Sequence, residues 1–102
     1  MAISDIQQKG SWYQIFDGSG KKIQDLAVST VGELCGHSTE IIVFKRGSWY
    51  VIHDEKGKTL NELAVSAAGD FRSVSGNTII FKRGSWIDTY DVKGKKVNSR
   101  AA

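Results

Sequence analysis

The chain alternates between short hydrophobic runs and polar turns along its whole length. The runs at residues 41–44 and 78–81 are rich in isoleucine and phenylalanine at consecutive positions, which is typical of a β-strand covered on both faces. A Lys-Arg-Gly-Ser turn follows each run, and aromatic and β-branched residues follow the turn. The pattern therefore predicts strands near Ile41–Lys45, Trp49–Asp54 and Thr78–Lys82.

A second kind of turn follows these hairpins. The sequence Asp-x-x-Gly recurs at 17–20, 54–57 and 91–94, with aspartate first and glycine fourth, as in type I turns. We expect a further strand after it, through Lys58–Ser66 in the middle copy. Apolar residues of that segment also fit helical spacing, so a short helix is the alternative. They are Leu60, Leu63, Ala64, Ala67 and Ala68.

These elements repeat with a fixed period of 37 residues. The tripeptide Gly-Ser-Trp ends at Trp12, Trp49 and Trp86, at a constant spacing of 37. Comparison of residues 10–46 with 47–83, without gaps, gives 18 identical positions. A constant period of this size indicates a repeat architecture.

The repeat predicts an all-β chain, a single repeat domain of three tandem four-stranded antiparallel meander units. The opening strand of a unit is expected at Glu33–His37 and again at Asp70–Ser75. The first unit lacks this strand, so we expect eleven strands, and we expect another chain or the segment Lys95–Ala102 to cover the edge that is left. The units span approximately 1–31, 32–68 and 69–102.

Three such units must cover each other's apolar faces, and two arrangements do this. The segment 76–95 resembles the middle strands of a β-propeller blade, including its Tyr90-Asp91 ending and its Gly94-Lys95 turn. This resemblance implies blade-like sheets. A propeller needs about four or more blades, so a second copy of the chain would have to complete the ring.

The other arrangement is a β-prism, in which three sheets close within one chain. The chain length and period are similar to those of the bulb-lectin form of this fold. The sugar motif of these lectins, Gln-x-Asp-x-Asn-x-Val-x-Tyr, matches only at Tyr90, because Lys82, Gly84, Trp86 and Asp88 occupy the other positions. The resemblance therefore implies the size of the fold and no sugar site.

Composition and charge narrow the class of protein. With 102 residues, 40% hydrophobic and 25% charged, the chain has the composition of a folded globular domain. Its net charge of +3 permits an anionic partner. We see no basic segment followed by an apolar run at the start, and no apolar stretch near the ~20 residues of a membrane span. We expect a cytoplasmic protein without membrane association, and the single Cys35 favours a reducing compartment.

The three tryptophans occupy one position of the repeat, each after a basic turn. This repetition favours a core role for Trp12, Trp49 and Trp86 as the large buried residue of each unit. The alternative is a set of aromatic platforms that bind bases or sugar rings beside cations. The candidate binding residues are then Trp12, Trp49, Trp86, Lys45, Arg46, Lys82 and Arg83.

The distinctive residues are spread evenly over the copies, whereas an enzyme usually concentrates them in one cluster. Cys35 and His37 lie two apart on a predicted strand and could form half of a metal site or a thiol–base pair, but no third ligand is visible nearby. We expect no catalysis, cofactor or metal. The expected function is a small non-catalytic binding or assembly module that forms homo-oligomers. The alternative is a nucleic-acid or glycan binder that uses the tryptophans and basic turns.

Overall fold

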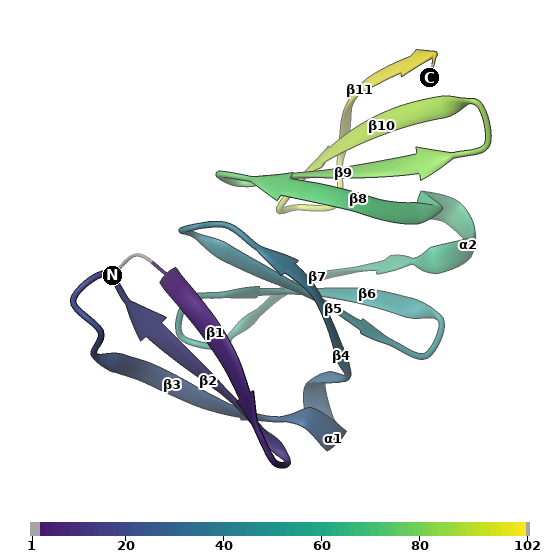
Figure 1. The fold of residues 1–102 in the computed structure, drawn as a ribbon. Coiled ribbons are helices and arrows are strands. Elements are labelled where there is room, and N and C mark those ends of the chain that lie inside the picture. The colour runs from purple at the N-terminus through teal and green to yellow at the C-terminus, as the bar shows by residue number, and fades with distance from the viewer. Residues whose placement is uncertain (1–2, 102) are drawn as a thin grey trace.

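The 37-residue repeat folds into three antiparallel meander sheets that follow one another along the chain (Figure 1). The structure is a computed structural model and describes residues 3–101. The elements are β1 (Ile3–Lys9), β2 (Trp12–Asp17), β3 (Lys22–Ala27), α1 (Val28–Val31), β4 (Glu33–His37), β5 (Ile41–Arg46), β6 (Trp49–Asp54), β7 (Thr59–Ala64), α2 (Val65–Ala68), β8 (Asp70–Ser75), β9 (Thr78–Arg83), β10 (Trp86–Asp91) and β11 (Lys96–Ala101).

The predicted all-β fold with eleven strands is confirmed. The strand orders are β1-β2-β3, β4-β5-β6-β7 and β11-β10-β9-β8, and every neighbouring pair is antiparallel. The first sheet has three strands, as expected for a unit without its opening strand. Within residues 3–101, β1 pairs only with β2. The C-terminal segment does not cover this edge, because it forms β11 and pairs with β10.

The fourth strand of the middle unit is followed by a single helical turn. β7 ends at Ala64, which pairs with Trp49 at the very start of β6, so no partner strand remains for the residues beyond. Val65–Ala68 then form α2, and α1 occupies the equivalent place before β4. The sequence left strand and helix as alternatives for the segment after Lys58. The structure contains both, first the strand and then the helical turn. In residues 3–101 neither helix has the length and apolarity needed to cross a membrane.

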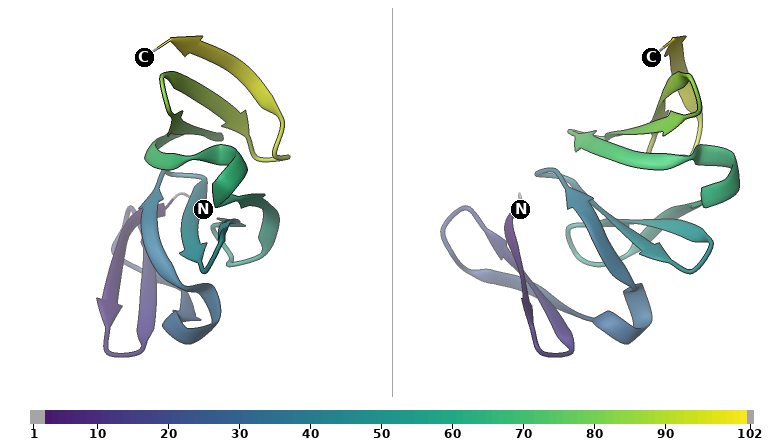
Figure 2. Two further views of the ribbon diagram at one scale, coloured as in Figure 1. Left: turned by 90° about the vertical axis from the view of Figure 1, so that its right-hand side faces the viewer. Right: turned by 45° about the vertical axis from the view of Figure 1, so that its right-hand side comes forward.

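The middle sheet is covered on both faces. Successive residues of a strand point to opposite sides. Ile42 and Phe44 of β5 therefore enter a core shared with the first sheet, whereas Ile41 and Val43 enter a core shared with the third sheet. Both views in Figure 2 show the middle sheet between the other two. In a β-prism, three sheets surround one common core and each sheet keeps one face outside. The middle sheet has no such outside face, so the sheets stack face to face, like propeller blades.

Both connectors between sheets are hydrogen-bonded by a tyrosine of the preceding sheet. The Tyr50 hydroxyl donates to the Gly69 carbonyl oxygen at 2.7 Å and accepts from the Phe71 amide at 3.2 Å. Tyr13 makes the equivalent two bonds in the first connector. In the third sheet the same position is Ile87, which has no hydroxyl. The tyrosines therefore fix where the next sheet begins.

Glycine is required at the end of each connector helix. Gly32 and Gly69 have φ values of 92° and 93°, a region that residues with a Cβ rarely adopt. A Cβ at Gly32 would also lie 2.5 Å from the carbonyl oxygen of Lys45. The backbone of one connector therefore passes directly against the neighbouring strand, which only glycine allows.

The two outward faces of the stack are more polar than the faces that meet inside it. On the first sheet, Gln14 takes the position that Val51 holds in the middle sheet. On the third sheet, Thr89 takes the position of Ile52. Polar outer faces are what terminal units of a stacked repeat need if water covers them.

Replacing Tyr50 by phenylalanine tests the role of the connector bonds. Tyr50→Phe leaves a carbonyl and an amide of the connector without their partner, so the free energy of unfolding should fall by about 1 to 3 kcal/mol, measured by urea denaturation. Tyr90→Phe removes the same atom from a buried tyrosine that makes neither bond and should cost less. Equal losses in the two variants would show that the connector bonds add nothing specific.

Candidate functional site

The tryptophans lie half exposed at the ends of the sheets, and the expected core role is wrong. Trp12 is 51% exposed, and Trp49 and Trp86 are each 47% exposed. Each is the first residue of its strand, beside the turn. The face of Trp12 has no sheet over it in the described residues, yet its exposure nearly equals that of the other two. A neighbouring sheet therefore covers little of the indole, and the buried position belongs to the next residue, such as Tyr50.

Three further positions of the repeat share a sheet face with each tryptophan. They are the basic residue directly opposite it, the residue two places further along its strand, and the residue opposite that one. We name these groups the first, second and third tryptophan sites. They contain Lys9, Trp12, Gln14 and Asp25; Arg46, Trp49, Val51 and Glu62; and Arg83, Trp86, Asp88 and Ser99.

The predicted basic residues divide between the two faces of their sheets. Arg46 and Arg83 lie opposite tryptophans and share their faces. Lys45 lies opposite Tyr50 and Lys82 opposite Ile87, so both lie on the other face. The structure therefore brings the two arginines to the tryptophans and takes the two lysines away from them.

The first tryptophan site forms a hollow of about 400 Å³ on the outward face of the first sheet. Lys9, Trp12, Gln14 and Asp25 line it. Asp25 also forms an ion pair with Lys22, whose Nζ lies 3.1 Å from its Oδ2. The hollow thus combines an exposed indole with an ammonium, an amide and a carboxylate, which can donate and accept hydrogen bonds on several sides of a ligand.

The second tryptophan site is tied to the connector before its sheet. The Nη1 of Arg46 donates to the carbonyl oxygen of Thr30 in α1 at 3.2 Å. Val51 replaces the amide found in the first site, and Glu62 replaces the aspartate. This site keeps the aromatic and charged groups of the first and has one polar side chain fewer.

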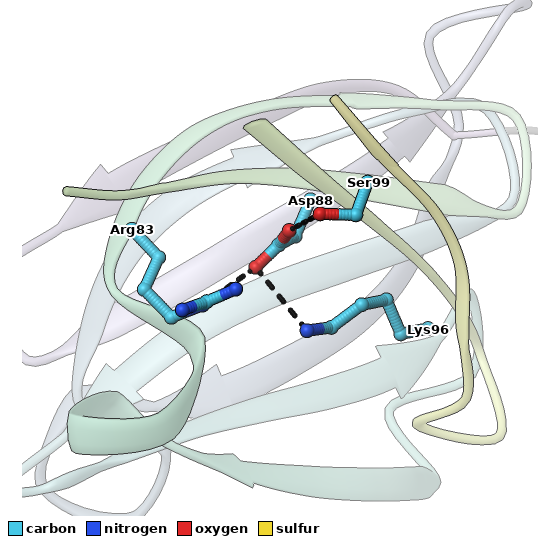
Figure 3. A network of polar contacts seen from close by, with 4 residues as sticks. All are labelled: Arg83, Asp88, Lys96 and Ser99. Carbon is cyan, nitrogen blue, oxygen red and sulfur yellow. Dashed lines mark hydrogen bonds and ion pairs between the residues drawn. The ribbon is translucent and has the colours of Figure 1, made fainter. Parts of the chain in front are cut away.

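The third tryptophan site holds a buried carboxylate (Figure 3). Asp88 is 0% exposed. Its Oδ1 accepts from the Ser99 hydroxyl at 2.6 Å, and its Oδ2 accepts from Arg83 Nε at 2.9 Å and lies 3.6 Å from Lys96 Nζ. The Ser99 bond, followed by the Arg83 bond and the positive charge of Arg83 and Lys96, holds the pKa of Asp88 below its usual value, although burial opposes this shift.

Cys35 and His37 do not form the expected pair, because the register of β4 shifts between Leu34 and Gly36 and sets them on opposite faces. Cys35 packs against the core shared with the third sheet, whereas His37 lies opposite Ile42, which belongs to the core shared with the first sheet. Burial, followed by the nearby charge of Glu33, raises the pKa of the Cys35 thiol, and a protonated thiol is a poor nucleophile. The Nδ1 of His37 lies 3.2 Å from the carbonyl oxygen of Ser38. In the part of the chain from 3 to 101, no three histidine, cysteine or acidic side chains gather as metal ligands would.

Comparisons with models of protein families, with curated proteins and with solved structures find no significant match to this chain. The chemistry of the three tryptophan sites therefore carries the functional argument.

The lowered pKa of Asp88 predicts how a variant responds to acid. The folded state favours the ionised carboxylate, so its stabilising contribution is present above the ordinary pKa of 3.8 and is lost as the pH falls through the lower folded value. Asp88→Asn should therefore melt below the parent protein near pH 7, and the difference should shrink toward pH 2. A difference in melting temperature that stays constant over this range would contradict the assignment.

Proposed function

We propose that this protein is a non-catalytic carbohydrate-binding module, with the hollow at Trp12 as its primary site. The observation that carries the proposal is the combination of a half-exposed indole with three polar side chains in one hollow. A volume of about 400 Å³ lies within the range of small-ligand sites.

The chemistry of a sugar ring suits these residues. A pyranose presents a C–H face that can lie on an indole, and hydroxyl groups at its rim that both donate and accept hydrogen bonds. Trp12 offers the flat apolar surface. The carboxylate of Asp25 accepts, the ammonium of Lys9 donates, and the amide of Gln14 does both.

Charge on this face supports a neutral ligand over a nucleic acid. Asp5 and Asp25 share the face with Lys9 and Lys22, so two carboxylates balance two ammonium groups. Binding of nucleic acid depends mainly on cations that neutralise phosphates. Carboxylates beside the stacking residue would repel such a backbone, whereas they bind sugar hydroxyls well.

Two further expectations from the sequence complete the proposal. The module acts by binding alone, which agrees with the protonated thiol of Cys35 and with the repetition of a tryptophan and an opposite basic residue in all three sheets. We place it in a reducing compartment, the cytoplasm, because its lone cysteine has no internal partner for a disulfide.

We also infer self-association of two copies through the outer edge of β1, with which no strand of residues 3–101 pairs. An exposed strand edge can pair with another strand. Antiparallel pairing of two copies of β1 about Gln7 would set Asp5 opposite Lys9 of the partner subunit, twice by symmetry. This match of charges favours a dimer joined at that edge, and the polar outward faces weigh against face-to-face contact.

Replacing Trp12 by alanine tests the carbohydrate proposal. On an array of neutral and acidic oligosaccharides, Trp12→Ala should lose about 1 to 3 kcal/mol of binding free energy, the amount typical of one lost ring stack. Its free energy of unfolding should fall by only about 1 to 2 kcal/mol, because a half-exposed tryptophan loses less than a buried one. Val97→Ala, at another exposed apolar residue, should keep binding intact. Binding of no sugar by the parent protein would refute the proposal.

The dimer is tested by mass in solution. Light scattering should give twice the mass of one chain, 11.2 kDa, at high concentration. Asp5→Lys would set like charges against each other at the edge and should return the protein to the monomer. Asp70→Lys, the same change at the exposed start of β8, should leave the dimer unchanged. A monomer at every concentration would exclude the association.

A further inference from the structure

The third tryptophan site differs from the other two in its balance of charge. In the first site, Asp5 and Asp25 offset Lys9 and Lys22 on the same face. In the third site one carboxylate, Asp88, faces two cations, so the cluster in Figure 3 keeps a net charge of +1.

The two cations of this cluster are more exposed than the carboxylate that they share. Arg83 binds Asp88 through Nε, which leaves the two terminal amino groups of the guanidinium unused by that bond. The side chains of Arg83 and Lys96 are 42% and 38% exposed, whereas Asp88 is 0% exposed. An arriving ligand therefore meets the cations, and Asp88 stays behind them.

Asp88 acts here as a positioning residue. Ser99 fixes one of its oxygens and Arg83 binds the other, so the guanidinium has a defined place beside Trp86, its cross-strand neighbour. An arginine whose planar group is already oriented loses less entropy when it binds an oxyanion. In the second site, by contrast, Arg46 spends one terminal amino group on the Thr30 carbonyl.

We propose that the third tryptophan site binds a sugar that carries a carboxylate, with the acid on Arg83 and Lys96 and the ring on Trp86. This assignment rests on the proposed carbohydrate function and adds a ligand class to it. A guanidinium receives a carboxylate through two parallel N–H donors, and the adjacent indole accounts for a ring rather than a simple ion. The chain would then hold a neutral-sugar site on its first sheet and an acidic-sugar site on its third.

The test compares methyl glucuronide with methyl glucoside, which differ in a carboxylate against a hydroxymethyl group. The indole N–H signals of the three tryptophans in NMR spectra report each site separately. We expect methyl glucuronide to shift the Trp86 signal with at least about tenfold higher affinity than methyl glucoside, the minimum expected of one charged hydrogen bond. The preference should weaken as salt is added.

Variants show which residues produce the preference for methyl glucuronide over methyl glucoside. Arg83→Gln should abolish it, and Lys96→Gln, which leaves the Arg83–Asp88 bond in place, should reduce it. Arg100→Gln makes the same change of charge on the opposite face of this sheet and should retain it. Melting curves check that the variants are folded.

The possible results distinguish failure of the acidic-sugar site at Trp86 from failure of the proposed carbohydrate binding at Trp12. If methyl glucuronide has no advantage at Trp86, or if Arg83→Gln keeps the advantage, the acidic-sugar site is refuted while oligosaccharide binding at Trp12 can still stand. If sodium sulfate shifts the Trp86 signal as strongly as methyl glucuronide, the site binds a simple oxyanion and the assignment to a sugar is wrong. If no sugar shifts any indole signal, both assignments fail.

Discussion

The place where each following sheet begins depends on one group, a tyrosine hydroxyl that makes two hydrogen bonds to the connector before that sheet. In an antiparallel meander, each strand finds its partner through a short turn, so a single sheet forms from local contacts. The step from one sheet to the next has no such turn. Tyr50 supplies the missing contact by binding both a carbonyl and an amide of the connector. Gly69 lets the connector approach closely enough for this to happen.

The secondary structure could be predicted from the sequence because it follows from local features. Apolar runs, the two recurring turns and the 37-residue period located the strands, and β4, β6 and β8 have the expected bounds. The way the sheets stack could not be predicted, because the consecutive apolar residues of β5 indicate that both faces are covered but not which sheets cover them. Which of these forms depends on contacts between residues that are far apart in the chain, such as Phe44 with Tyr13.

The candidate site was predicted only in part, for a different reason. Repetition shows that the three tryptophans are equivalent, but it does not show whether their common position is inside or outside. Their exposure follows from a place at the end of a strand. Agreement between the copies could not predict Gln14, Asp25 and Asp88 as site residues, because these positions differ from copy to copy, unlike the repeated tryptophan and basic turn. The sequence did contain a sign of the third site, a difference between copies: the charged Asp88 occupies the repeat position of the apolar Val51.

The double coverage of the middle sheet also ranks the three units by how readily they open. Unfolding an end sheet exposes one core, whereas unfolding the middle sheet exposes two, so amide protons of β5 and β6 should be the slowest to exchange with solvent. The hollow at Trp12 and the charge cluster at Asp88 both lie on end sheets. A ligand that binds only the folded sheet stabilises it. Binding at either place therefore slows the opening of the sheet that opens most readily.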